Sequence, residues 1–336
     1  MSTPRAGTRD AAAFRPAVSA LHHRPSVRAA AGHAPDALLD DALALLADGA
    51  VGEALAGLVP GLRRAYDALP ADAWAAFATE RCLTHPVAEL LHQDPFVYRA
   101  FAKLRGYPGD AGILDLIYEA VPLPAGTTAL GATLYAYNLD APACRSVRYR
   151  RDFLADAIDA AAAAAPGRAR VLSVACGHLR EAQRSAAVRD GSLGAFYALD
   201  QDPLSVALLR EEHAALGVTP VLGSVRDVLT GRLRFEGLTL AYAAGLYDYL
   251  PTPVAARLTA RMFDMLAPGG RLIVANFCPG LRDVGFMESF MAWRLIYRDE
   301  AGMREIAAAV PGEEVARQRV FRDPGGDVVY LEIERR

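Results

Sequence analysis

The stretch "VLSVACGHLREA" (residues 171–182) decides the fold, because an apolar run meets a glycine and a helical pattern follows. Nucleotide-binding units begin in this way, but their loop is usually rich in glycine. Ala175 and Leu179 stand where such a loop has its outer glycines, and only Gly177 remains. The stretch therefore predicts the first strand of a nucleotide-binding sheet that carries an altered loop.

From Gly167 onward, strand-like and helix-like segments alternate along the chain. Four more strands are predicted by "AFYALD" (195–200), "VTPVLGS" (218–224), "LTLAYAAG" (238–245) and "RLIVANFC" (271–278). Helices are predicted for residues 179–191 and 203–217, and residues 252–270, which end in an APGG turn, connect the last two of these strands. This alternation is typical of a doubly wound, Rossmann-like α/β domain with a mostly parallel sheet. Two strands joined by a Pro-Gly-Gly turn, within residues 313–335, predict an antiparallel C-terminal edge.

The N-terminal half has a different pattern. Residues 1–33 mix Ser, Pro, Ala, Gly, Arg and His without a sustained period, which predicts a flexible or loosely docked arm. From Asp36 the apolar residues recur at three- and four-residue spacing. A further helix is expected after Asp110, and a long one ends at Pro166–Gly167. We therefore predict a helical cap over residues 34–145 and the α/β domain over residues 146–336.

Composition limits the classes of partner. The 336 residues are 53% hydrophobic and carry a net charge of −3, which offers no electrostatic reason to expect nucleic acid or an anionic membrane. The four cysteines form no CxxC pair, so a disulfide framework or a zinc site is not expected. No apolar run approaches the ~20 residues that span a bilayer. A cytoplasmic protein without a metal is expected, with a small molecule as its partner.

The carboxyl ends of the predicted strands are where a ligand should lie. Asp200 closes the second strand, where a carboxylate can accept both ribose hydroxyls, although it could instead cap a helix. Asp202 directly precedes Pro203 and is the better candidate for that cap. A dinucleotide would need glycines around its pyrophosphate, and these are missing. The pattern favours a nucleoside without phosphates, such as S-adenosylmethionine.

These motifs resemble those of class I S-adenosylmethionine-dependent methyltransferases. The residues that carry the resemblance are "VLSVACG", "ALDQDP", "GSVRDV", "AYAAGLYDYLP" and "LAPGGRLIVANF", which lie within residues 146–336. A longer set, "RGYPGD", "NLDAPACRSVRYRRDFL", "GLYDYLP" and "NF", resembles a bacterial subgroup with a helical N-terminal region. That set extends the resemblance back to about residue 95.

The resemblance implies roles for particular residues. Gly177 is expected against the methionyl part of S-adenosylmethionine, Asp200 at the ribose, and Ser224 and Val225 beside the adenine. The full set of predicted binding residues lies at or beside the strand ends, with one residue from the cap: Ala175, Gly177, His178, Arg180, Asp200, Gln201, Ser224, Val225, Arg226, Gly245 and Arg148.

The altered loop leaves the contacts to the methionyl carboxylate open. Arg180, expected at the N-terminus of the first helix of the α/β domain, could pair with the carboxylate or could be a solvated surface residue. Arg105 and Arg148 are alternatives from the cap. His178 could act as a base or could lock the loop by hydrogen bonds, and we prefer the structural role.

Candidate catalytic residues are expected where aromatic side chains meet the sulfonium, which an aromatic face favours by ~1–2 kcal/mol. Tyr247 and Asp248 end the fourth strand, and Tyr107 and Asn138 could reach the site from the cap. A single tyrosine is more often a packing residue. Residues 292–300, which include Trp293, are expected to form a helix that could line the substrate pocket.

Three functions remain open from the sequence. The first is methyl transfer to a small-molecule acceptor of the kind found in secondary metabolism. The second is cyclisation of S-adenosylmethionine to azetidine-2-carboxylate with release of methylthioadenosine, because the "GHLREA" loop resembles that of azetidine-2-carboxylate synthases. The third is a binding module without catalysis. The alanine-rich cap also leaves a homodimer open.

Overall fold

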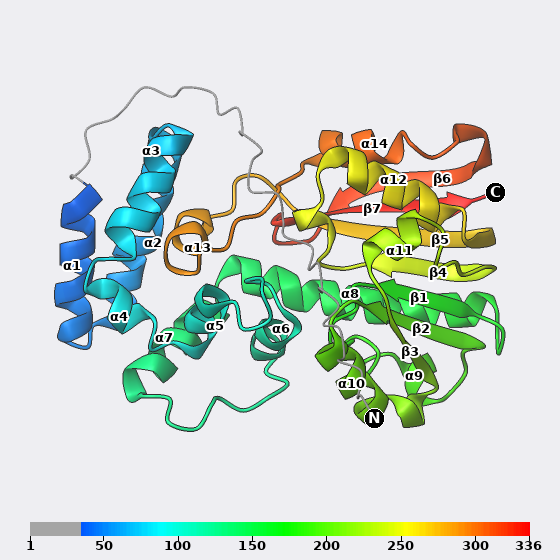
Figure 1. The fold of residues 1–336 in the computed structure, drawn as a ribbon, viewed down its shortest axis with the longest axis horizontal. Coiled ribbons are helices and arrows are strands. Elements are labelled where there is room, and N and C mark those ends of the chain that lie inside the picture. Colours follow the sequence, from blue (N-terminus) through cyan, green and yellow to red (C-terminus); the bar gives the residue numbers. More distant parts are fainter. Residues whose placement is uncertain (1–34) are drawn as a thin grey trace, which may run out of the picture.

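The computed structural model describes residues 35–336, in which a helical cap lies beside an α/β domain (Figure 1). The predicted arm lies outside the described residues. The cap helices preceding the α/β domain are α1 (Pro35–Ala47), α2 (Val51–Ala68), α3 (Ala71–Ala76), α4 (Val87–Leu91), α5 (Pro95–Ala102), α6 (Ala111–Ile117) and α7 (Ala129–Leu139). A π-helical turn, Phe77–Cys82, follows α3 directly.

Side-chain caps determine where α5 and α6 begin. The Asp94 side chain accepts the N–H of Phe96 at the start of α5, which has Pro95 as its first residue. Asp110 accepts the N–H of Ile113 at the start of α6. An acidic side chain that satisfies free N–H groups of a first turn stabilises a helix start by about 1 kcal/mol. The predicted helix start after Asp110 is confirmed.

Helix α8 (Pro142–Ala164) joins the cap to the α/β domain, and Figure 1 shows it running from the one to the other. Its buried stripe includes Val147, Leu154, Ile158 and Ala161, at helical spacing. Arg150 lies on the same stripe and is also buried. The predicted long helix is therefore present, and one charged residue interrupts its apolar face.

The sheet has seven strands in the order β3-β2-β1-β4-β5-β7-β6. The first five pair in parallel, whereas β7 pairs antiparallel with both β5 and β6. This confirms the predicted doubly wound, mostly parallel sheet with an antiparallel C-terminal edge. The strands are β1 (Arg170–Val174), β2 (Ala195–Asp200), β3 (Val218–Leu222), β4 (Leu238–Ala243), β5 (Leu266–Phe277), β6 (Val315–Arg322) and β7 (Val328–Arg335).

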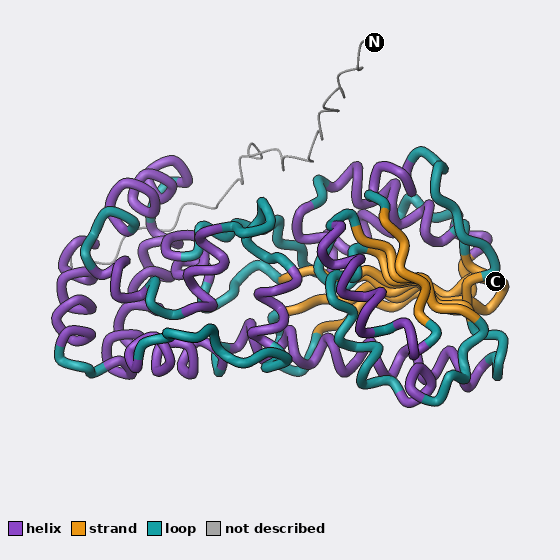
Figure 2. Tube along the Cα trace, turned by 60° about the horizontal axis from the view of Figure 1, so that its bottom comes forward, coloured by secondary structure: helices purple, strands orange, loops and turns teal. Residues whose placement is uncertain are grey.

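Helices cover both faces of this sheet (Figure 2). Consecutive residues of a strand point to opposite faces, and Val171 and Leu172 accordingly belong to two different apolar clusters. The cluster of Val171 takes in α8, α9 (Ala186–Arg189) and α10 (Pro203–Glu212). The cluster of Leu172 takes in α11 (Val225–Leu229), α12 (Thr252–Phe263) and α14 (Glu300–Ala307).

Two predicted helices are wrong in whole or in part. The helix expected over residues 179–191 is reduced to α9, and turns occupy most of residues 177–184. Leu179 has a positive φ of 51°, which a right-handed helix does not allow. Residues 292–299 have no regular structure, because the N–H groups of Ile296 and Arg298 donate to Asp248 and Phe277 at the strand ends.

The chain returns to the cap after β5. Helix α13 (Val284–Phe290) packs against α2, so the helical region is not a single continuous part of the sequence. Gly285 allows this contact, because a Cβ at that position would lie 2.6 Å from the backbone of Leu62. The carboxyl end of β5 thereby connects directly to the cap.

Candidate functional site

The loop after β1 keeps the left-handed backbone that suits a glycine-rich loop, although it lacks the two outer glycines. Ala175, Gly177 and Leu179 have φ angles of 54°, 56° and 51°, all in the left-handed region. This region costs a non-glycine residue roughly 1–2 kcal/mol. The two residues that replace glycines are therefore held in the conformation that glycines would adopt, and other contacts must hold them there.

Asp200 ties this loop to the end of β2. Its Oδ2 accepts the N–H of Gly177 at 2.7 Å, and its Oδ1 accepts the N–H of Asp202 at 2.9 Å. Burial raises the pKa of Asp200, and the two backbone N–H groups oppose that rise. Each carboxylate oxygen has a second lone pair, so Asp200 can still accept hydroxyl groups from a ligand. Asp202, as predicted, caps α10 through the N–H groups of Leu204 and Ser205.

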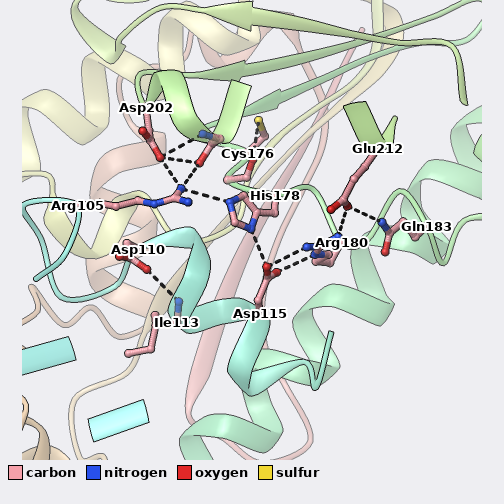
Figure 3. A network of polar contacts seen from close by, with 12 residues as sticks. Arg105, Asp110, Ile113, Asp115, Cys176, His178, Arg180, Gln183, Asp202 and Glu212 are labelled. Atoms are coloured by element: carbon pink, nitrogen blue, oxygen red, sulfur yellow. Dashed lines mark hydrogen bonds and ion pairs between the residues drawn. The ribbon is translucent and has the colours of Figure 1, made fainter. Parts of the chain in front are cut away.

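A chain of ion pairs locks the loop to the cap (Figure 3). The Asp115 carboxylate of α6 accepts two bonds from Arg180, at 2.7 and 2.8 Å, and pairs with Nδ1 of His178 at 2.8 Å. Arg105 contacts Nε2 of His178 at 3.2 Å and donates to Asp202 at 2.5 Å. Burial alone would raise the pKa of Asp115, but the bonds from Arg180 and His178 lower it to about 2.

These contacts give the predicted loop residues mainly structural positions. All three guanidinium nitrogens of Arg180 are bonded, two to Asp115 and one to Glu212. Arg180 also precedes α9 by several residues and does not start a helix, contrary to the prediction. Both ring nitrogens of His178 are engaged, which favours the locking role over that of a base.

The remaining predicted binding residues lie at three places. Ser224 caps α11 in a capping box with Asp227, while Val225 is half-buried and Arg226 is exposed. Gln201 is exposed in the turn after β2. Arg148 donates to the backbone carbonyls of Leu139 and Ile117, within the cap. Its guanidinium therefore fixes α8 to α6 and α7.

The carboxyl end of β4 carries the aromatic part of the site. Tyr249 and Tyr107 meet edge to face, with ring centroids 6.4 Å apart, and the Trp293 indole N–H donates to the Tyr249 hydroxyl at 2.9 Å. Burial and the negative charges of Asp200, Asp110 and Asp202 raise the pKa of Tyr107 far above its ordinary value. Tyr107 of the cap thus lies near Asp200 and contacts Tyr249, which follows β4.

Tyr247 and Asp248, the predicted catalytic pair, point to different surroundings. Tyr247 is fully buried in the apolar cluster beneath α12, and its hydroxyl bonds that of Thr259 at 3.0 Å. That position favours packing over catalysis. The Asp248 carboxylate accepts the Phe277 N–H at 2.7 Å, and burial raises its pKa to about 6. Asp248 therefore holds a proton near neutral pH more readily than an ordinary carboxyl.

Asn138 belongs to a neighbouring pocket between the cap and the sheet. Its amide donates to Asp94 at 2.7 Å. The pocket is almost wholly apolar, and Trp293 and Phe277 connect it to the strand ends. Other lining residues include Phe96, Cys144, Met287 and Met291. The structure thus places an apolar pocket beside the aromatic group at β4.

Sequence reasoning missed Arg150. Its guanidinium lies beside Gly245, where a Cβ would be 3.5 Å from Nη2, and its Nε is buried without a hydrogen-bond partner among the residues that the structure describes. One partial signal was available, because the helical spacing of Val147, Leu154 and Ile158 puts either Arg150 or Arg151 on the apolar stripe without showing which. Burying a charge at such a position is costly unless a partner within the chain or a bound ligand compensates it.

Two findings on the described residues concern metals and membranes. Within residues 35–336, no three His, Cys, Asp or Glu side chains are grouped so as to hold a metal ion. None of the helices in this part of the chain combines the length and the apolar character that crossing a membrane requires.

Comparisons with known proteins show a similarity of fold. No protein-family model and no curated protein matches the sequence. Among solved structures, the chain is similar to a possible exported protein from Bordetella parapertussis, with 17% identity, a TM-score of 0.57, and coverage of 80% of this chain and 97% of that one. It is also similar to the N-methyltransferase NodS from Bradyrhizobium japonicum, with 15% identity, a TM-score of 0.40 and coverage of 58% and 89%. Magnesium protoporphyrin IX methyltransferase from Synechocystis has 16% identity, a TM-score of 0.40 and coverage of 58% and 87%.

Proposed function

We propose that the protein is a methyltransferase that uses S-adenosylmethionine and a small-molecule acceptor. The observation that carries the proposal is the position of Gly177, Asp200 and Gly245 at the carboxyl ends of β1, β2 and β4, which are neighbours in the sheet, with Tyr107 of the cap near Asp200. Strand β1 lies between β2 and β4, which makes its end the switch point where open sheets bind ligands. Asp200 retains free lone pairs there for two ribose hydroxyls.

The conformation of the loop after β1 favours a nucleoside ligand that has no pyrophosphate. Dinucleotides place their phosphates at the N-terminus of a helix that follows the first strand. Here turns occupy the residues after Gly177, and α9 begins only at Ala186. A Cβ at Gly177 would lie 3.1 Å from the side chain of Ala111, so α6 of the cap closes over the loop. These features favour S-adenosylmethionine over NAD.

Tyr107 and Tyr249 suit a sulfonium, because aromatic rings favour a desolvated cation by ~1–2 kcal/mol. The apolar pocket at Trp293 and Phe277 adjoins these rings and would hold the acceptor in a dry position. A lone pair of the acceptor attacks the methyl carbon, and the electrons of the carbon–sulfur bond remain on sulfur. Asp248 is our candidate to take the acceptor proton.

The first test is incubation of the full chain with S-adenosylmethionine, alone and with a panel of apolar phenols and amines, followed by mass spectrometry. S-adenosylhomocysteine and a methylated acceptor, formed only in the presence of the acceptor, would support the proposal. Methylthioadenosine with azetidine-2-carboxylate from S-adenosylmethionine alone would overturn it in favour of cyclisation. Binding without any product across the panel would favour the non-catalytic module.

The second test examines Asp248. With an active acceptor, Asp248→Asn should lower kcat by roughly 10²–10⁴-fold, which is the usual contribution of a general base. Because burial raises the Asp248 pKa to about 6, wild-type kcat should rise with pH through about 6. A variant with unchanged kcat would remove Asp248 from the mechanism while leaving methyl transfer in place.

A further inference from the structure

Arg150 on α8 is a buried arginine that forms no ion pair with any described residue. The residue is 2% exposed, and its Nε has no hydrogen-bond partner in the described part of the chain. Within residues 35–336, no carboxylate forms an ion pair with its guanidinium. Its polar neighbours are the hydroxyls of Tyr118, to which it is hydrogen-bonded, and of Tyr330, and the carboxyls of Glu181 and Asp248. Both carboxyls have other partners, because Glu181 accepts the Tyr242 hydroxyl and Asp248 accepts the Phe277 N–H.

The other buried arginines show how unusual this is in the molecule. Arg180 bonds two carboxylates, and Arg298 donates to the carbonyls of Tyr247 and Leu250 and to the side chain of Asn276. A buried charge that lacks such partners costs several kcal/mol. An arginine retained under that cost is poised for an anionic group that comes from outside the chain.

The position of Arg150 identifies that group. Nη2 lies beside Gly245, at the end of β4, whereas Asp200 lies at the end of β2 on the other side of β1. A ligand with its ribose at Asp200 would cross the loop at Gly177 and reach Gly245 with its opposite end. In S-adenosylmethionine, that opposite end carries the methionine carboxylate.

We propose that Arg150 binds the carboxylate of the methionine part of S-adenosylmethionine, a role for which the sequence suggested Arg180, Arg105 or Arg148. Those three guanidinium groups are already bonded to Asp115, to Asp202 and to backbone carbonyls, respectively. Arg150 matches a carboxylate as a planar donor that can form two parallel bonds. The assignment holds only if the protein binds S-adenosylmethionine, so it rests on the proposed function.

The test compares two unreactive ligands by isothermal titration calorimetry: S-adenosylhomocysteine and its decarboxylated analogue, which keeps the adenosine and the amine. Removing one partner of a buried charge pair lowers affinity by about 30-fold or more. We expect wild-type protein to bind S-adenosylhomocysteine at least about 30-fold more tightly than the analogue. This arm alters the ligand alone, so it carries no risk of misfolding.

The variants assign the effect to Arg150. Arg150→Met should reduce the affinity ratio to about 3-fold or less while the analogue still binds as it does to wild type, which shows that the site is folded. Arg148→Met, on the same helix, should keep the wild-type ratio. A wild-type ratio near one, or a ratio that Arg150→Met leaves unchanged, would overturn the assignment of Arg150 alone. Failure of the wild type to bind either ligand would overturn the proposed function as well.

Discussion

Buried charged groups at the carboxyl edge of the sheet are bonded differently on its two halves. On the β1–β2 side, Asp115, His178 and Arg180 bond one another, and Asp200 accepts two backbone N–H groups. On the β4 side, Arg150 has no ionic partner among the described residues, and the carboxyl of Asp248 accepts one backbone N–H.

This difference separates the groups that hold the shape of the site from those available to a ligand. A buried polar group with partners within the chain stabilises the fold, whereas one without partners costs free energy until something binds it. The loop after β1 is therefore the rigid half. Its residues His178 and Arg180, on either side of the left-handed Leu179, are both bonded to Asp115. The half at the end of β4 is the one whose charged groups we expect to bind the ligand.

The largest effect should come from breaking the rigid half. Asp115→Ala leaves Arg180 and His178 buried without their common partner, so the free energy of unfolding should fall by about 3–5 kcal/mol. Urea unfolding measures this change. Asp67→Ala is the control, because Asp67 forms an exposed ion pair with Arg63 and should cost about 1 kcal/mol or less. Equal losses in the two variants would show that the network does not stabilise the loop.

The second prediction concerns the pH dependence of stability through Asp248. Burial raises its pKa to about 6 in the folded protein, from an ordinary value of 3.8. The folded state therefore binds this proton more tightly than the unfolded state does, and stability falls as pH rises from about 4 to about 6. Relative to Asp248→Asn, wild-type stability should fall by roughly 1–3 kcal/mol across this window.

Urea unfolding of both proteins from pH 4 to pH 7 tests this expectation. Burial also raises the pKa of Asp94 to about 6, but Asp94 titrates in both proteins. The difference between the two stability curves therefore reports Asp248 alone. Parallel curves would mean that Asp248 is solvated or paired in the folded protein.

A smaller effect distinguishes the two tyrosines at the β4 end. Tyr247→Phe removes the bond to Thr259 and should lower stability by about 1 kcal/mol without changing kcat. Tyr249→Phe removes the acceptor of the Trp293 indole N–H, next to the proposed acceptor pocket, and should raise KM. Steady-state kinetics with the best acceptor separates the two. A loss of kcat in Tyr247→Phe would restore it as a catalytic candidate.

The smallest effect should come from restoring a glycine to the loop. Ala175 is exposed and has a left-handed backbone conformation, so Ala175→Gly should relieve strain. The free energy of unfolding should rise by up to about 1 kcal/mol, and the melting temperature should rise slightly with it. Ala160→Gly, at an exposed position of α8, should instead lower stability by about 0.5–1 kcal/mol. Destabilisation by both changes would mean that the loop is not strained at Ala175.

Local patterns predicted structure correctly where no distant contact overrode them. The Asp202–Pro203 pair predicted a helix cap, and Asp202 caps α10, because capping involves only the next few residues. The helix expected after Gly177 was largely wrong. Contacts of His178 and Arg180 with Asp115, more than 60 residues away in the sequence, hold the loop in turns instead.

The catalytic and binding residues remain predictions, and the structure changes which of them are best placed. Tyr107 and Asp248 lie near the strand ends together with Tyr249. Arg150 was missed because the sequence showed four arginines close together in "RSVRYRR" without showing which one is buried. Only the packing of α8 against the sheet distinguishes Arg150 from Arg148 and Arg151.

The sequence by itself determined the strands, their alternation with helices and the antiparallel C-terminal edge. Such features follow from side-chain periodicity and turn chemistry, which act between near neighbours. The tertiary structure decided which charges are paired. A long side chain finds its partner through the three-dimensional packing of separate elements, so the sequence could not show that Asp115 satisfies Arg180 while Arg150 is left without a carboxylate partner in residues 35–336.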